Sequence, residues 1–386
     1  MNIALKAWVD RNLKGDPVIW AIVFALSVLS VLVVYSSTET LAYKTMRGNT
    51  EHYLIRHGAL ILLSLFAMWV AHRIDYRFYA RLSTLALWVS VPLLLYTWLF
   101  GTNLNEASRW ITIPLIDTSF QPSDLAKLAL ITHLAGMLSR RQQNINDIKD
   151  TLIPLLIWSG VICGLIAMTN VSTAVLLFST CMIVLFIGRV PVHYLFLLCV
   201  VGMLSGGVAF KLGQRGQTVI SRVQDFVSPT EIPYQAQQSF IAIANGGIKG
   251  RGPGNSNQKD FLPHPYSDFI FAIIVEEYGF IGGIFTILLY LGLLYRGMRA
   301  ASNSENAFGG LLAAGLSLAL VIQAMINICV SVGLMPITGL PLPLLSMGGT
   351  SLLFTGLAVG IILSVSRGDT SQIAMQTKGN SFRKVA

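Results

Sequence analysis

A series of long apolar runs, separated by short polar segments, is the strongest constraint on this chain. A helix needs about 20 apolar residues to cross the hydrocarbon core of a bilayer. Only 12% of the 386 residues are charged and 54% are hydrophobic, whereas soluble domains carry about 25% charged residues. The sequence therefore predicts an all-α integral membrane protein, one polytopic domain over 1–386, with about ten transmembrane helices at 17–36, 54–72, 80–100, 122–139, 152–169, 171–188, 192–212, 268–295, 306–332 and 342–366.

The distribution of lysine and arginine predicts the orientation. Most of these residues flank the runs on one side of the membrane, while the short loops of the other side hold Lys44, Arg47, Arg56 and Arg109. Cytoplasmic loops carry the excess of positive charge, so both termini and the tail 367–386 are predicted to be cytoplasmic. The net charge of +9 is then a topology signal, and it does not indicate a nucleic-acid partner.

One long segment, 213–267, lies between the seventh and eighth runs and is predicted to form an extracytoplasmic loop. Segments of this length without their own secondary structure are usually functional or disordered. Its glycine cluster, 246–254, has no preceding strand or following helix of the kind that a nucleotide-binding loop needs. The glycines instead predict a backbone that bends sharply or lies close to a ligand.

Charged residues in or beside the predicted helices are candidates for function, because burying charge in a membrane is costly. Asp124 and Lys127 open the fourth run. They are three residues apart, so they can also pair with each other along one helix face. Both interpretations, a functional site and a self-neutralised pair, stay open at this stage.

Three carboxylates mark the eighth run. Ser267 or Asp268 fits a helix N-cap, which is the structural alternative to a catalytic role for Asp268. Glu276 and Glu277 lie two turns deeper, and at about 100° per residue Glu276 shares the sector of Asp268 more closely than Glu277 does. Adjacent carboxylates in a membrane need partners or protonation, and Lys127 is one candidate partner.

Cations in the predicted outer segments suit an anionic lipid-linked substrate, because arginine binds phosphate through two donors. The alternative for each of them is ordinary solvation of a loop. A run of prolines and glycines at 341–351 predicts either an irregular segment near an outer cavity or a simple helix kink. None of the histidines or cysteines has metal-ligand spacing, so no metal site is predicted. The outer cations are Arg109 (beside Trp110), Arg215, Arg222, Lys249, Arg251 and Lys259.

Together these segments resemble the SEDS family of peptidoglycan glycosyltransferases, the FtsW/RodA type. The resemblance covers most of the chain, including the ten-span layout and the long outer loop. Its order and spacing are more specific than any single motif. The motifs are residues 105–111, 121–127, Tyr234-Gln235, 237–239, 254–259, 267–272, Glu276-Glu277 with Gly279, and 339–351.

The resemblance implies polymerisation of lipid II at the outer face of the bacterial cytoplasmic membrane, with inversion at the anomeric carbon and undecaprenyl pyrophosphate as the leaving group. Asp268 would be the catalytic acid–base residue, because a hydroxyl is a poor nucleophile until its proton is removed. Positive charge is needed against the pyrophosphate, and whether a divalent cation assists stays open. Arg109, Lys127, Arg215 and Arg222 are the candidates for pyrophosphate binding, and the supporting candidates are Trp110, Asp124, Glu276, Glu277, Gln258, Lys259 and Ser346.

The segment 254–259 is similar to the division-type (FtsW) branch, which implies septal cell-wall synthesis with divisome proteins. The implied partner is a class B penicillin-binding protein that cross-links the glycan. The sequence departs from the family pattern at Glu106, Asp124, His264, Ser267 and Met347, so no function is assigned to His264.

Three alternatives compete with a division-type enzyme. The first is an elongation-type (RodA) paralogue with the same activity. The second is a flippase or other transporter of the lipid-linked precursor, since a polar-lined bundle also suits translocation. The third is a scaffold that only holds a transpeptidase.

Overall fold

The computed structural model describes residues 12–45, 50–104, 107–113, 118–142, 145, 147–212, 216–227 and 232–384. Within these residues one long helix coincides with each predicted apolar run. Seven helices are long and apolar enough to cross a membrane, α8 and α9 are shorter apolar helices, and α6 is not in either group. The membrane character is confirmed, and the count of ten spans stays a prediction. The helices are α2 (Pro17–Ser37), α4 (Thr50–Arg73), α5 (Tyr76–Phe100), α6 (Pro122–Arg140), α7 (Ile153–Thr169), α8 (Val171–Ile187), α9 (Val192–Leu212), α12 (Ile270–Asn303), α13 (Ala307–Ser331) and α14 (Thr350–Lys384).

The last span and the predicted tail differ from the sequence expectation. The tenth run was expected to begin at 342, but α14 begins at Thr350, because the prolines and glycines of 341–349 cannot continue a helix. The same helix then continues to Lys384 through most of the predicted tail 367–386. At the other close junction, Asn170 ends α7, and its side chain caps α8 by accepting from the Thr173 amide.

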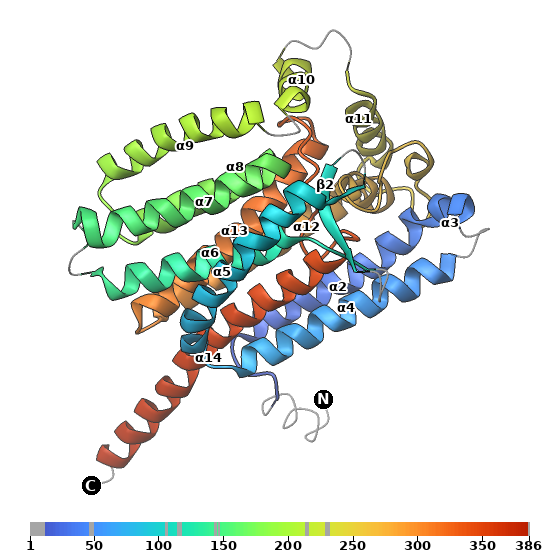
Figure 1. The fold of residues 1–386 in the computed structure, drawn as a ribbon. Helices are drawn as coiled ribbons and strands as arrows, with labels where there is room; N and C mark the ends of the chain where they lie inside the picture. Colours follow the sequence, from blue (N-terminus) through green and yellow to red (C-terminus); the bar gives the residue numbers. More distant parts are fainter. Residues whose placement is uncertain are drawn as a thin grey trace.

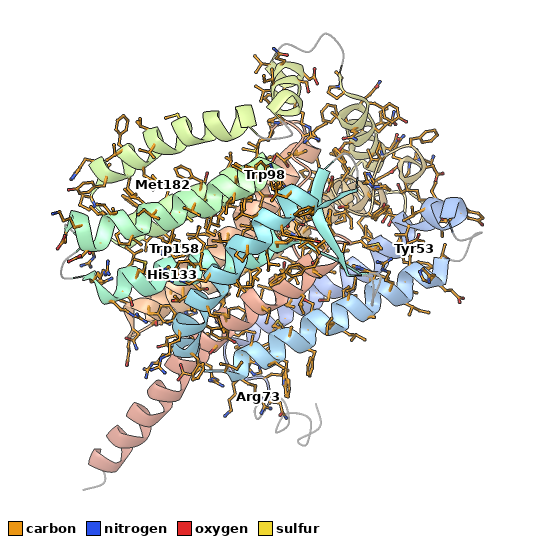
Figure 2. The ribbon with its side chains drawn as sticks, viewed as in Figure 1. Tyr53, Arg73, Trp98, His133, Trp158 and Met182 are labelled. Carbon is orange, nitrogen blue, oxygen red and sulfur yellow. The ribbon has the colours of Figure 1, made fainter. Side chains whose placement is uncertain are left out.

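The bundle has two ends, which Figures 1 and 2 show. Tyr53 and Arg73 mark opposite ends of α4. The Arg73 end carries the start of α2 and the C-terminal part of α14. There Arg73 donates to Asn12, and Arg296 pairs with Asp16. The opposite end carries α3 (Glu39–Thr45), the small sheet, α10 and α11. We call it the distal end.

The all-α prediction is confirmed, and the described residues add one small sheet at the distal end. Strands β1 (Thr102–Leu104), β2 (Ala107–Ile113) and β3 (Thr118–Phe120) form an antiparallel sheet in the order β1-β2-β3. Thr350, at the start of α14, donates a hydrogen bond from its hydroxyl to the Ser119 carbonyl and accepts one from the Gln121 amide. The segment between α5 and α6 is therefore fixed against the 341–349 segment.

The segment 213–267 is also more regular than a long loop. It contains α10 (Gly216–Val227), α11 (Tyr234–Gly246) and a short 3₁₀ turn, Gln258–Asp260. Figure 1 shows α10 and α11 above the distal ends of α12 and α13. These short helices therefore cover the region where the long helices begin and end.

Candidate active site

α12, the helix of the predicted eighth span, is broken two residues past the second of its two glutamates. Gly279 has φ +70° and ψ −172°, so the helical hydrogen-bond ladder is interrupted there. Segment 246–252 takes over the backbone groups that the break releases: Arg251 and Gly252 donate to the carbonyls of Glu276 and Glu277, at 3.0 and 2.9 Å. Phe280 in turn donates to Gly247, at 2.9 Å. The loop and the helix are thus paired backbone to backbone.

The glycine cluster allows segment 246–252 to lie directly against the backbone of α12. A Cβ on Gly250 would lie 2.2 Å from the Glu277 carbonyl oxygen, and a Cβ on Gly246 would lie 2.0 Å from that of Val275. Gly250 also has φ +80°, which other residues rarely adopt. The predicted sharp bend is confirmed, and the surface that approaches the cluster is α12.

The buried Glu276 carboxylate anchors the loop that follows the cluster. It is 0% exposed and accepts from Ser256 Oγ and from the amides of Asn257 and Gln258, both at 3.2 Å. Arg251 lies 4.0 Å away. Charge-assisted bonds from backbone donors are among the stronger hydrogen bonds, so Glu276 holds 256–258 in place.

The predicted partner of the two glutamates is therefore wrong. Glu277 accepts from Ser36 on α2. Lys127 instead pairs with Asp124 at 2.8 Å and donates to Gln323 at 3.3 Å. The self-neutralised pairing of Asp124 and Lys127 is confirmed as geometry. The pair borders a cavity of about 50 Å³ together with Gln323 and Ser351.

Asp268 lies in a non-helical segment just before α12, half-buried at the distal end. The N-cap interpretation is wrong, because α12 begins at Ile270 with Phe269 at its N-cap position and no side-chain capping bond. Asp268 Oδ1 accepts from Ser267 Oγ at 3.0 Å. A carboxylate that does not cap the helix is available for a ligand.

Two side chains fix the backbone that carries Asp268. Asn327 on α13, which is 1% exposed, donates to the carbonyls of Asp268 and Leu340 at 2.8 and 2.7 Å. Ser346 donates to the Ser267 carbonyl at 2.6 Å and accepts from the Leu342 amide at 2.8 Å. The 341–349 segment and residues 267–268 are thereby held together, and the irregular segment predicted near an outer cavity supports Asp268 directly.

Sequence reasoning missed Asn327. It lies in the middle of an apolar run, and a buried amide there is a usable signal, because buried polar groups need partners. Which carbonyls it meets depends on the fold of 340–346 and 267–268, which lie far from it along the chain.

Replacement of Asn327 by leucine, which has a similar size, is expected to lower the thermal midpoint of the purified protein. It leaves two buried carbonyls without a donor, at a cost of about 1–3 kcal/mol each. Ser317→Ala is the control, because Ser317 is buried on the same helix and its Oγ has no partner among the described residues. Equal midpoints for the two variants in a detergent melting experiment would contradict the clamp.

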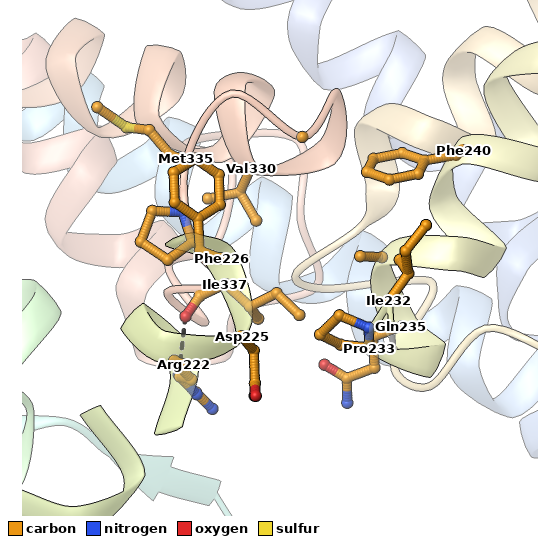
Figure 3. Close-up of a pocket in the computed structure, with 13 residues that line it drawn as sticks. Arg222, Asp225, Phe226, Ile232, Pro233, Gln235, Phe240, Val330, Met335 and Ile337 are labelled. Atoms are coloured by element: carbon orange, nitrogen blue, oxygen red, sulfur yellow. Dashed lines mark hydrogen bonds between the residues drawn. The ribbon is translucent and has the colours of Figure 1, made fainter. Parts of the chain in front are cut away.

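Arg222 on α10 brings positive charge toward Asp268. Burial lowers the pKa of its guanidinium and the charge of Asp268 raises it. Its Nη1 donates to the Ile337 carbonyl at 3.0 Å. Figure 3 shows Arg222, Asp225 and Gln235 on one side of a cavity of about 360 Å³, with Phe240, Val330 and Met335 on the other. An apolar cavity with a cation at its margin suits an amphiphile with an anionic head.

The remaining predicted site residues are placed as follows. The side chain of Arg109, on β2, and the whole of Arg215 lie outside the described residues. Trp110 is half-buried on β2, where its backbone pairs with Thr102. Lys259 and Gln258 belong to the loop that Glu276 anchors, and Lys259 pairs with Glu39 on α3 at 2.5 Å.

The residues around Asp268 do not form a protein-built metal site. In the part of the chain that the structure describes, no group of three or more His, Cys, Asp or Glu side chains could hold a metal ion. Asp268 is a single carboxylate, with Ser267 as its bonded neighbour.

Comparison with known proteins shows which family the chain belongs to. The sequence profile FtsW/RodA/SpoVE, described as "Cell cycle protein", matches residues 16–371. The chain belongs to the FtsW/RodA/SpoVE family. The SEDS resemblance that the motifs indicated is confirmed.

Full-length relatives agree with this assignment. The "Probable peptidoglycan glycosyltransferase FtsW" of Geobacter metallireducens is 33% identical over 376 residues, which cover 95% of this chain and 98% of that protein. The "Stage V sporulation protein E" of Bacillus subtilis is 32% identical and covers 92% of this chain and 98% of its own length.

Solved structures share the fold. A chain in the structure described as "Structural coordination of polymerization and crosslinking by a peptidoglycan synthase complex" matches with a TM-score of 0.73 and 25% identity, over 92% of this chain and 98% of that chain. The rod shape determining protein RodA of Thermus thermophilus matches with a TM-score of 0.67 and 24% identity, over 92% and 97%. The FtsW/RodA/SpoVE fold therefore extends over nearly the whole chain.

Proposed function

We propose that this protein is a peptidoglycan glycosyltransferase that polymerises lipid II, with Asp268 as its acid–base residue. The observation that carries the proposal is the Asp268 carboxylate, half-buried in a non-helical segment that Asn327 and Ser346 hold rigid. The names of the full-length relatives support the same activity.

The proposed chemistry uses this geometry. Asp268 removes the proton from the sugar 4-hydroxyl while the hydroxyl oxygen attacks the anomeric carbon of the second substrate. The bond between that carbon and undecaprenyl pyrophosphate breaks, with inversion at the carbon. The proton ends on Asp268 and is released to solvent. Negative charge accumulates on the departing pyrophosphate. Arg222 lies within electrostatic range of Asp268, so its guanidinium is placed to stabilise the charge on the pyrophosphate. The cavity beside Arg222 suits the first isoprene units.

The site lies at the distal end, which we assign to the outer face of the bacterial cytoplasmic membrane. Arg73, Arg296 and Arg367 lie at the other end, where Arg367 donates to the Arg73 carbonyl. Under the positive-inside rule that end faces the cytoplasm, so both termini are cytoplasmic.

The proposed partner is a class B penicillin-binding protein transpeptidase, in a septal divisome. The support is the match to a chain of a peptidoglycan synthase complex, the name FtsW of the Geobacter relative and the family description "Cell cycle protein". An elongation role would pair the same activity with a different transpeptidase.

Labelled lipid II and purified protein, with and without the cognate transpeptidase, test the activity. We expect glycan chains on a polyacrylamide gel. A protein that makes no polymer in either mixture, yet moves labelled lipid II across liposomes, would be a transporter, and one that does neither would be a scaffold.

Arg222→Ala is expected to lower kcat/KM for lipid II by about tenfold or more, because a charge-assisted contact to the pyrophosphate is worth about 1.5–3 kcal/mol. Arg222→Lys should restore part of the loss, since lysine keeps the charge but not the paired donors. Lys249→Ala is the matched control, because Lys249 is an exposed cation of the same segment. Equal kcat/KM values for Arg222→Ala and Lys249→Ala would exclude the role.

A further inference from the structure

A polar groove runs across the distal end, between α3 and the loop 254–266. It consists of a cavity of about 450 Å³ next to a second one of about 170 Å³, which share Thr40, Lys259 and Asp260. The larger cavity alone falls within the range of about 300–1,000 Å³ that ligand sites occupy. We call the two together the outer groove. The larger cavity is also lined by Glu39, Tyr43, Gly254, Asn255, Ser256 and Asn257.

The smaller cavity of the outer groove is lined by the segment that leads into Asp268. Its wall includes His264 and Tyr266, and Tyr266 lies two residues before Asp268. Burial raises the pKa of the Tyr266 phenol, and the nearby charges of Tyr53 and Asp268 raise it further. The Tyr266 carbonyl accepts from the Met347 amide at 2.9 Å, which fixes this wall to the segment that supports Asp268. One end of the outer groove is thus formed by the segment that carries Asp268.

The charges of the outer groove disfavour a pyrophosphate. Among the described residues that line it, Lys259 is the one lysine or arginine, and it already pairs with Glu39 at 2.5 Å and donates to the Gly254 carbonyl at 3.1 Å. Asp260 adds a second carboxylate. With two carboxylates and one paired ammonium, the described part of the lining offers a diphosphate no unpaired cation. Arg222 lines a different cavity.

The same lining suits a sugar chain. Asn255 and Asn257 offer amide donors and acceptors to hydroxyl and acetamido groups. Tyr43 is 68% exposed at the rim, where its ring presents a flat apolar face to the C–H side of a pyranose. The chemistry is that of a neutral polyhydroxylated ligand, and it differs from that of the Arg222 cavity.

The floor of the outer groove is held in place before any ligand binds. The buried Glu276 carboxylate binds Ser256 Oγ and the amides of Asn257 and Gln258. The Lys259 amide donates to Ser256 Oγ at 3.2 Å. A preformed surface avoids part of the ordering cost of binding, which gives the buried Glu276 a role that the chemical step does not require.

We propose that the outer groove binds the sugar residues of the glycan strand next to the end that reacts at Asp268. The proposal rests on the proposed function, because a polymerase must keep the joined sugars somewhere after each bond forms. One end of the groove is formed by the segment that carries Asp268, and its larger cavity has a mostly polar lining. It would keep the strand bound between successive additions, and so determine how many sugars are joined before release.

The test compares two double variants of the full-length protein in detergent. Tyr43→Ala with Asn257→Ala removes the exposed ring and one amide of the groove. Tyr295→Ala with Asn303→Ala removes the same two residue types, both exposed, from the other end of α12. The first readout is binding of a soluble, lipid-free peptidoglycan tetrasaccharide by calorimetry. The second is the length distribution of the polymer made from labelled lipid II.

For the groove variant we expect Kd for the tetrasaccharide to rise by about tenfold or more, equivalent to about 1.4 kcal/mol, and the polymer to become shorter. The initial rate of lipid II consumption should change by less than about threefold. The control variant should match the unmodified protein in both readouts.

Two results would overturn the proposal. One is a groove variant that binds the tetrasaccharide and makes polymer of the same length as the control, in which case the polymerase function stands without the groove. The other is an unmodified protein that does not bind the tetrasaccharide saturably. Failure of the unmodified protein to make any polymer counts against the proposed function, and the binding readout then decides the groove alone.

Discussion

Asp268→Ala is expected to abolish glycan polymerisation while the protein stays folded. Loss of a positioned acid–base group lowers a rate by about 10²–10⁴-fold. The side chain of Asp268 makes one described hydrogen bond, to Ser267, whereas the bond from Asn327 goes to its backbone carbonyl. The substitution therefore removes the chemistry without removing the clamp. Polymer formation from labelled lipid II and the thermal midpoint are the two measurements.

Asp268→Asn separates the proton transfer from the shape of the site. It has the same size and can still accept from Ser267, but it cannot take a proton at neutral pH. We expect it to be as inactive as the alanine variant. Glu305→Ala, an exposed carboxylate at the other end of the bundle, should retain full activity. An Asp268→Asn protein that polymerises at the normal rate would exclude Asp268 as the base.

Gly250→Ala is expected to give the largest loss of stability. The added Cβ would lie 2.2 Å from the Glu277 carbonyl oxygen, at a residue with φ +80°. A left-handed conformation alone costs a non-glycine residue about 1–2 kcal/mol. The overlap adds displacement of the backbone that pairs with α12, so the total should exceed about 4 kcal/mol, a range reserved for a few severe mechanisms.

Gly247→Ala is the matched control within the same cluster. Gly247 also has a positive φ, +53°, but a Cβ there would meet nothing within 4 Å. Its ψ of −145° places it in a region that glycine favours, so the alanine variant should lose only this conformational strain, about 1–3 kcal/mol. Melting followed by tryptophan fluorescence, with size-exclusion profiles, compares the two proteins. Equal midpoints for both variants would show that the loop does not depend on its contact with α12.

Hydropathy located the long helices because the requirement for a span is local. A run such as 80–100 must be helical wherever it lies in the bundle. The same reasoning placed the carboxylates 268, 276 and 277 near the distal end. The hydropathy prediction failed within α12, where Gly279 interrupts the helix, and at the start of α14, which follows the irregular 341–349 segment. The reasons for both interruptions lie elsewhere in the chain.

The contacts around Asp268 could not be predicted, because they join backbone groups that are distant in sequence. Asn327 meets carbonyls at 268 and 340, and Glu276 meets amides at 257 and 258. A carboxylate in an apolar run signals cost and hence function, but it does not say whether it performs chemistry or holds a loop. In the fold, Glu276 accepts from the loop amides of 257 and 258, whereas the Asp268 carboxylate accepts from Ser267 alone among the described hydrogen bonds, which leaves it open to the proposed acid–base role.

The break in α12 also bears on how the chain is made. The loop 246–258 is synthesised before residues 276–281, yet its amides and carbonyls find their partners there. On the proposed topology the loop first crosses to the outer side of the membrane. Its backbone groups stay unpaired with α12 until the first turns of that helix have entered the bilayer. Closure of this pairing is therefore a late step in biogenesis, and the polymerase stays incomplete on the ribosome until its eighth span has been inserted.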